Sequence, residues 1–202
     1  MNEAEFLNKL RLQAERDSYF YSNKGRAERE IWAVSEFLNG IGARHSKEEL
    51  ICQQQDSKID VRYSECSFQL KEITDPDERR GKYYKDTCNM LRQASALSEV
   101  KYEQELKDIP EVTRSYNLIA QYVEELSAQA RYIPVKSHLD LLIYVTRTRS
   151  APVDVSEVDA AVLLRLGWRS ISFFNSKQYM VLCAATDAPS ILREKALRVK
   201  MC

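Results

Sequence analysis

An aspartate followed at short range by a polar residue and a lysine is the part of this sequence best suited to chemistry. Asp60 lies in the stretch KIDVRYSECSFQLKEI, with Gln69 nine residues later and Lys71 eleven residues later. The stretch reads as two short strands joined by a turn. Because alternate residues of a strand share one face, Gln69 and Lys71 point the same way, while Leu70 faces a core.

These residue types match the needs of phosphodiester hydrolysis, which are an activated water and neutralisation of charge on the phosphoryl oxygens. Mg²⁺ or Mn²⁺ supplies both, and Mg²⁺ prefers hard oxygen ligands. We expect Asp60 to be the first metal ligand, beside the side-chain oxygen of Gln69 and the main-chain carbonyl of Leu70. Lys71 would orient the water or stabilise developing negative charge. A plain ion pair between Asp60 and Lys71 is the simpler alternative.

The surrounding sequence indicates the elements that must hold this motif in place. Apolar spacing predicts helices over residues 3–22 and 26–39, strands over 50–54, 58–63 and 67–73, helices over 82–100 and 112–131, a strand over 139–146, a helix over 155–166, strands over 169–174 and 178–184, and a last helix from about residue 188. This order indicates an α/β fold with a mixed central sheet flanked by helices.

Two of these elements carry more specific expectations. The run LDLLIYVT over residues 139–146 is apolar enough for a central buried strand. Ser156 is expected to cap the helix over 155–166, with Glu157 and Asp159 in its first turn. Since no low-complexity linker interrupts the chain, we expect one domain over residues 1–202.

An acidic helix precedes the Asp60 motif, in the segment KGRAEREIWAVSEFLNGIG from Lys24 to Gly42. Together these pieces resemble the PD-(D/E)XK, or restriction-endonuclease-like, nuclease superfamily, in the arrangement of its archaeal Holliday junction resolvase and Mrr-like branches. By that resemblance Glu28 is the helix glutamate that reaches the metal. Asp60 and Gln69 are then the strand ligands, and Lys71 is the catalytic lysine.

The resemblance implies a restriction-endonuclease-like domain with a motif core over about residues 24–73 and an added helical segment over about 76–131. The phrases LGWRSISFF and DAPSILR, at residues 166–174 and 187–193, resemble the end of a small bacterial family described as "putative endonucleases" and assigned the same fold. Folds of this kind are often dimeric, so a homodimer is compatible with the resemblance.

Two positions depart from the superfamily pattern. Ile59 stands where a proline usually precedes the strand aspartate, and Gln69 stands where an Asp or Glu is usual. The amide lowers the negative charge of the site and with it the expected metal affinity. The helix acid is also open from the residues alone, because helical geometry puts Glu30 nearer than Glu28 to the edge of the apolar stripe.

A second segment mixes basic and aromatic residues that can contact phosphates and stack on bases. Its members are Arg79, Arg80, Lys82, Tyr83, Tyr84 and Lys85. A charged turn in front of a helix is the alternative interpretation, because acidic neighbours dilute the positive field.

The overall composition narrows the classes of function. The 30 Lys and Arg balance the 30 Asp and Glu, which argues against a generic polyanion binder but leaves a local basic cleft open. Two histidines without zinc-ligand spacing disfavour a zinc hydrolase or a histidine triad. Five cysteines without a Cys-x-x-Cys pair indicate free thiols. With no apolar run long enough for a membrane span, we expect a cytoplasmic protein without a membrane partner.

The sequence therefore predicts a metal-dependent endonuclease that uses Mg²⁺ or Mn²⁺ and acts on DNA rather than RNA. Two alternatives are kept. A catalytically degenerate module of the same fold would bind nucleic acid or a protein partner. An intracellular toxin or defence effector would apply the same nuclease chemistry to RNA.

Overall fold

The computed structural model describes residues 2–76, 78–100 and 111–201, and the chain divides into two compact units. The first holds residues 1–29 and 76–109, and the second holds residues 30–75 and 110–202. The boundary falls inside helix α2 (Arg26–Gly40), after Arg29. The expected single domain stays a prediction. The segment expected as an insertion is nevertheless divided, because residues 76–109 belong to the first unit and residues 110–131 to the second.

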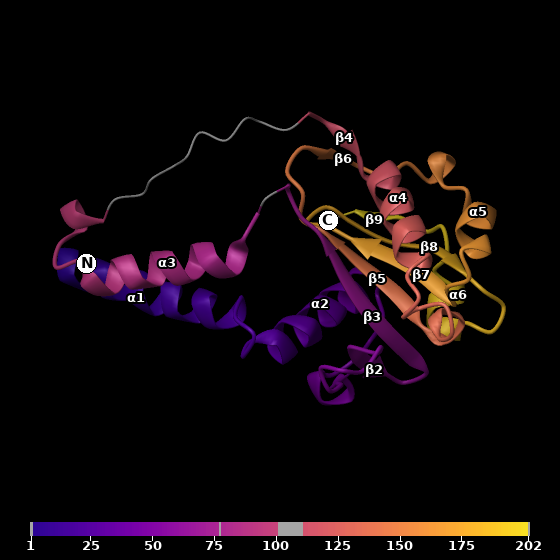
Figure 1. Ribbon diagram of the computed structural model, residues 1–202, viewed down its shortest axis with the longest axis horizontal. Coiled ribbons are helices and arrows are strands. Elements are labelled where there is room, and N and C mark those ends of the chain that lie inside the picture. Colours follow the sequence, from indigo (N-terminus) through magenta and orange to yellow (C-terminus); the bar gives the residue numbers. More distant parts are fainter. Residues whose placement is uncertain (1, 77, 101–110, 202) are drawn as a thin grey trace. The chain divides into compact units, whose positions relative to one another are not determined.

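The first unit is built on two long helices, α1 (Glu3–Phe20) and α3 (Arg80–Gln93), followed by the short helix η2 (Leu97–Glu99). The helices run antiparallel side by side (Figure 1), with the guanidinium Nε of Arg11 donating to the Leu91 carbonyl at 2.9 Å. Their facing positions form a small core of Leu7, Ala14, Cys88 and Leu91. Asn2 and Glu5 close the start of α1 as a capping box.

The second unit is built on a seven-stranded mixed sheet (Figure 1) with the order β1-β2-β3-β5-β7-β8-β9. The strands are β1 (Ile51–Cys52), β2 (Val61–Tyr63), β3 (Cys66–Ile73), β5 (Asp140–Val145), β7 (Ser170–Phe174), β8 (Gln178–Ala184) and β9 (Lys200–Met201). Strands β3, β5 and β7 are parallel, and the flanking pairs are antiparallel. Strands β4 (Thr113–Arg114) and β6 (Ser150–Ala151) form a separate parallel pair.

The prediction of a mixed α/β fold with a central apolar strand is confirmed, because β5 lies in the middle of the sheet. Its side chains alternate between two cores, as strand geometry requires. Leu141, Ile143 and Val145 pack with helices α4 (Ser115–Ser127) and α5 (Ala160–Arg165). Leu142 packs on the opposite face with α2 and α6 (Ser190–Arg193). The short helices η1 (Lys47–Glu49), η3 (Lys136–His138) and η4 (Val155–Glu157) complete the unit.

The prediction of a helix over residues 155–166 is wrong about where the helix begins. The structure has a single 3₁₀ turn at Val155–Glu157 and then α5 at Ala160–Arg165. Two aspartates cap these elements in place of Ser156: Asp154 accepts from the Ser156 N–H at 2.9 Å, and Asp159 accepts from the Val162 N–H at 2.9 Å. A carboxylate at each N-cap satisfies free N–H groups, so a new helix begins after the second aspartate.

A buried ion pair ties the starts of the three parallel strands together. Asp140 on β5 is 0% exposed and accepts from the Ser67 N–H of β3 at 2.8 Å and from the Ser170 hydroxyl of β7 at 2.8 Å. Arg169 donates to the same carboxylate through Nε at 3.1 Å and also through Nη2. Because its donors come from β3 on one side and from the start of β7 on the other, this carboxylate helps to fix the register of the sheet.

Two expectations about the chain as a whole can be compared with the described residues. Cys52, Cys66, Cys88 and Cys183 are free thiols, as predicted; Cys202 lies outside the described residues. Within the described ranges, no helix combines the length and the apolar character that crossing a bilayer requires.

Candidate functional site

The pairing of β2 with β3 brings Asp60 next to Gln69. Val61 lies opposite Phe68 in the antiparallel pair, and Asp60, which directly precedes β2, donates its N–H to the Phe68 carbonyl at 2.8 Å. One carboxylate oxygen of Asp60, Oδ2, accepts from the Leu70 N–H at 2.7 Å and from the side-chain amide of Gln69. The pairing that the sequence predicted therefore gives direct contact between Asp60 and both partners on β3.

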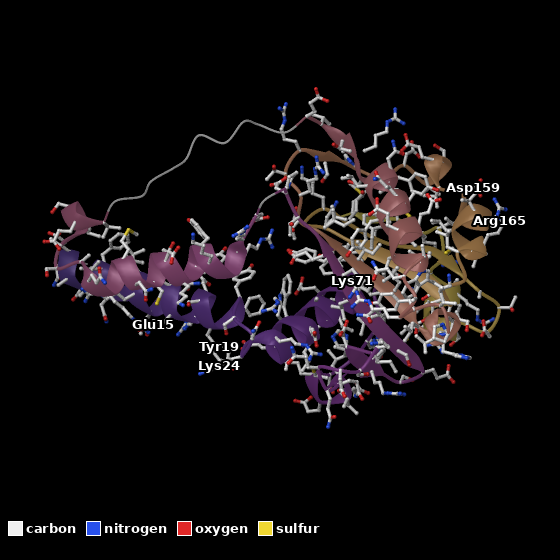
Figure 2. All side chains as sticks on the ribbon, in the orientation of Figure 1. Glu15, Tyr19, Lys24, Lys71, Asp159 and Arg165 are labelled. Carbon is white, nitrogen blue, oxygen red and sulfur yellow. The ribbon has the colours of Figure 1, made fainter. Side chains whose placement is uncertain are left out.

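Lys71 reaches the same cluster through the main chain of its neighbour. Its Nζ donates to the Leu70 carbonyl at 2.9 Å, and the Gln69 amide nitrogen lies 3.3 Å from the same oxygen. Phe68 and Leu70 pack on the opposite face, in the core under α2. The predicted shared face of Gln69 and Lys71, with Leu70 turned to a core, is thus confirmed. Figure 2 labels Lys71 on β3.

The ammonium of Lys71 lies in a partly desolvated and electrically mixed environment. Burial is the largest cause that lowers the pKa of Lys71, and the guanidinium of Arg131 lowers it further. The carboxylates of Asp60 and Glu30 act in the opposite direction, but the net direction of the pKa shift is downward. The loss of hydration therefore outweighs the attraction of the two acids.

The two candidate helix acids fall on different sides of the unit boundary. Glu30 belongs to the second unit, where it is half-buried and accepts from the thiol of Cys52 at 3.2 Å. Its charge also acts on Lys71. Glu28 belongs to the first unit and is exposed, so its part in the site stays a prediction. The structure therefore associates Glu30, the acid nearer the edge of the apolar stripe, with the Asp60 cluster.

Two residues that sequence reasoning missed, Arg131 and Tyr132, lie beside Lys71. The Tyr132 ring is 2% exposed, with the Lys71 Nζ 5.8 Å and the Arg131 guanidinium 4.7 Å from its centroid. Tyr132 also packs on Trp168 at a ring distance of 5.3 Å. The sequence does show a basic residue next to an aromatic one at the end of a predicted helix. It does not show that this pair lies close to Lys71, which is 60 residues before Arg131.

The donor atoms of the cluster are of the type that Mg²⁺ accepts, although their negative charge is low. Asp60 offers a carboxylate, Leu70 a carbonyl and Gln69 an amide oxygen, and all three are hard donors. Across the described residues, no three His, Cys, Asp or Glu side chains gather as a metal-binding group. The Gln69 nitrogen, not its oxygen, faces Asp60 and the Leu70 carbonyl. The donor types therefore fit a cation, which Asp60 and the Leu70 carbonyl would hold only weakly.

The basic and aromatic segment of α3 is only partly available for contacts with a ligand. Arg80 forms an ion pair with Glu78, with Nε 2.8 Å from Oε1, and Tyr84 stacks on Tyr21 at a ring distance of 4.4 Å. The exposed members of the segment are Arg79, Lys82, Tyr83 and Lys85. Nucleic-acid binding by these residues stays a prediction.

Fold and site together define a mixed α/β protein with a compact Asp–Gln–Lys cluster where β2 meets β3. The chain belongs to the family described as "Putative endonuclease, protein of unknown function (DUF1780)", whose model matches residues 2–201. A similar solved structure is a protein of unknown function from Pseudomonas aeruginosa strain PAO1, described under the monooxygenase superfamily. It is 23% identical with a TM-score of 0.60, over 100% of this chain and 97% of that one. This likeness concerns the fold alone. None of the curated proteins matches the chain.

Proposed function

We propose that this protein is an endonuclease of the restriction-endonuclease-like type that uses Mg²⁺ or Mn²⁺ to cleave DNA. The observation that carries the proposal is the contact of Asp60 with Gln69 and the Leu70 main chain, completed by Lys71 on the same carbonyl. The description of its family as endonucleases supports the same activity.

Each residue of the cluster has a role that follows from its chemistry. Asp60 and the Leu70 carbonyl would hold the cation, and the cation would supply an activated water and neutralise charge on the phosphate. Lys71, held at the Leu70 carbonyl, would place its ammonium at the developing negative charge of the phosphoryl oxygens. Glu30, from α2, would add the second carboxylate that Gln69 does not provide.

Gln69 would have two orientations. With its nitrogen towards Asp60 and the Leu70 carbonyl, the amide donates to both oxygens and relieves their mutual repulsion. With a cation bound, turning the amide by half a rotation would present its oxygen as a ligand instead. The amide therefore competes with the cation for the same oxygens, which predicts weak metal binding.

The direct test is cleavage of plasmid, single-stranded DNA and RNA with Mg²⁺ or Mn²⁺, and with EDTA as the metal-free control. Asp60→Ala and Lys71→Ala should each abolish cleavage. Lys177→Ala is the matched control, since Lys177 is exposed in the turn before β8. Cleavage that persists in both site variants would contradict the proposal, and cleavage of RNA alone would favour the effector alternative.

The orientation of Gln69 favours one second candidate, a binding module that has lost catalysis. The Gln69 amide already satisfies the Asp60 oxygen by a hydrogen bond, so the cluster is held together without a cation. In that case the protein would bind nucleic acid or a partner without cleaving it, and saturating Mg²⁺ would leave its melting temperature unchanged. A rise of the melting temperature with Mg²⁺ that is lost in Asp60→Ala would exclude this candidate.

A further inference from the structure

The cluster around Lys71 has a second cation, Arg131, to which the proposed function gives no role. Arg131 is exposed, yet its guanidinium lies 4.7 Å from the centroid of the buried Tyr132 ring, on which Lys71 also lies. Its charge acts on both Lys71 and Tyr132. Arg131 therefore belongs to the immediate surroundings of the Asp60 cluster.

The hydrogen bond that Arg131 makes leaves the two terminal nitrogens of its guanidinium towards solvent. Its Nε donates to the Gln129 side chain at 3.1 Å, which uses the inner side of the guanidinium. Among residues 2–76, 78–100 and 111–201, no carboxylate forms an ion pair with Arg131. The two terminal nitrogens are thus placed for an anionic acceptor that the described chain does not supply, and such paired donors suit a phosphate.

The position of Arg131 is fixed by the loop that carries it. The Tyr132 N–H donates to the Gln129 carbonyl at 2.9 Å, and the Tyr132 carbonyl accepts from Val135 at 3.0 Å and from Lys136 at 2.8 Å. The Trp168 ring, itself held by its Nε1 donating to the Ser127 hydroxyl at 2.8 Å, supports the ring of Tyr132. Arg131 therefore begins from an ordered backbone, which reduces the entropy lost when its side chain binds an anion.

The charge balance of the cluster favours such a residue. Asp60 and Glu30 repel the phosphates of a nucleic acid, and the proposed function already uses Lys71 at the scissile phosphate. Among the groups that act on Lys71, Arg131 is the only other cation in the described chain. We propose that Arg131 binds a backbone phosphate of the DNA whose scissile bond lies at the Asp60 cluster. This inference rests on the proposed function.

The test measures DNA binding apart from cleavage. Fluorescence anisotropy with a labelled DNA duplex in EDTA, from about 50 to about 200 mM NaCl, compares the wild type with Arg131→Gln. We expect about tenfold weaker binding and a salt slope reduced by about 1, because one phosphate contact is lost. Arg131→Lys should restore the slope but only part of the affinity, since a lysine donates as a point charge.

The control is Arg165→Gln, because Arg165 is also exposed but lies on α5, away from Lys71 in Figure 2. It should bind DNA like the wild type. Equal affinity and equal salt slope for wild type and Arg131→Gln would overturn the inference, as would a wild type that binds no DNA. A wild type that binds DNA through Arg131 but cleaves nothing would instead overturn the proposed nuclease and leave only the phosphate contact of Arg131 standing, without a scissile bond beside it.

Discussion

Two aspartates beside β3 show how one residue type serves different ends in this protein. Asp140 is fully buried, and it accepts from the Ser67 main chain, the Ser170 hydroxyl and the guanidinium of Arg169. Asp60 is only half-buried, and uncharged amide groups of Gln69 and Leu70 donate to it. Asp140 is neutralised by a cation that is part of the fold, whereas the contacts of Asp60 with Gln69 and Leu70 come from uncharged groups.

The difference separates a carboxylate that stabilises the fold from one that is suited to bind a cation. A buried carboxylate that the fold itself neutralises contributes to specifying strand pairing, and removing its partner leaves an uncompensated charge. A partly hydrated carboxylate held in position by amides retains the charge that attracts a cation. The same contrast and the groups around it give five predictions, from the largest expected effect to the smallest.

Asp140→Ala should lower the free energy of unfolding by about 3–5 kcal/mol, because Arg169 then keeps a desolvated charge without its partner. Asp60→Ala should lower it by only about 1 kcal/mol, since water can replace a half-buried carboxylate as acceptor. Urea unfolding followed by circular dichroism measures both. Similar losses for the two variants would break the contrast between them.

Glu30→Gln should reduce the rate of DNA cleavage by about 10–100-fold, the usual effect of removing a group that supports a metal site. The reason is the proximity of Glu30 to Lys71 and Cys52. Glu28→Gln is the matched change on the same helix, and we expect it to keep nearly full activity. If Glu28→Gln slows cleavage more than Glu30→Gln does, Glu28 is the helix acid, as the superfamily resemblance implies.

Gln69→Glu should tighten Mg²⁺ binding by about tenfold, or about 1.4 kcal/mol, because a second carboxylate then faces Asp60. Without metal the same repulsion should lower the melting temperature, and Mg²⁺ should restore it. Isothermal titration calorimetry and thermal melts measure the two effects. Asn117→Asp, the same chemical change at an exposed position of α4, should alter neither.

Cys66 and Cys183 should react very slowly with iodoacetamide near neutral pH, because burial raises the pKa of each thiol to about 12. Their ordinary value is 9.0, so the unfolded thiols ionise first, and stability should fall as the pH rises from about 9 towards about 12. The Asp140 charge adds to the rise of the pKa at Cys66, and it is not among the causes at Cys183.

Asp140→Asn should therefore lower the pKa of Cys66 and leave that of Cys183 unchanged. Mass spectrometry of alkylated peptides over a pH series follows the two thiols separately. An equal shift at both would mean that the variant loosens the whole sheet rather than removing one charge.

The sequence was sufficient for those parts of the fold and site that depend on local pattern. Alternation along β3 gave the shared face of Gln69 and Lys71, and the apolar run gave β5 its central place. The start of α5 could not be predicted, because Asp154 and Asp159, only a few residues apart, each cap a separate helical turn. That choice is made by packing, which a single sequence does not display.

Other parts of the site depend on contacts between distant residues. Nothing local links Arg131 and Tyr132 to Lys71, since their contact arises only when the loop after α4 folds against β3. Nothing local in the sequence indicates that the cation beside Asp140 is Arg169, 29 residues later. Long-range partners of this kind follow from topology, which short motifs do not encode.

The three-strand contact of Asp140 also has a consequence for the time course of folding. Strands β3, β5 and β7 are far apart in the chain, and parallel strands cannot pair through a short turn. Such non-local pairing is slow because a long loop must close first. A chain that has formed β3 and β5 but not yet received Arg169 would bury an unneutralised carboxylate. We therefore expect half-formed sheets to be disfavoured and the three central strands to assemble together.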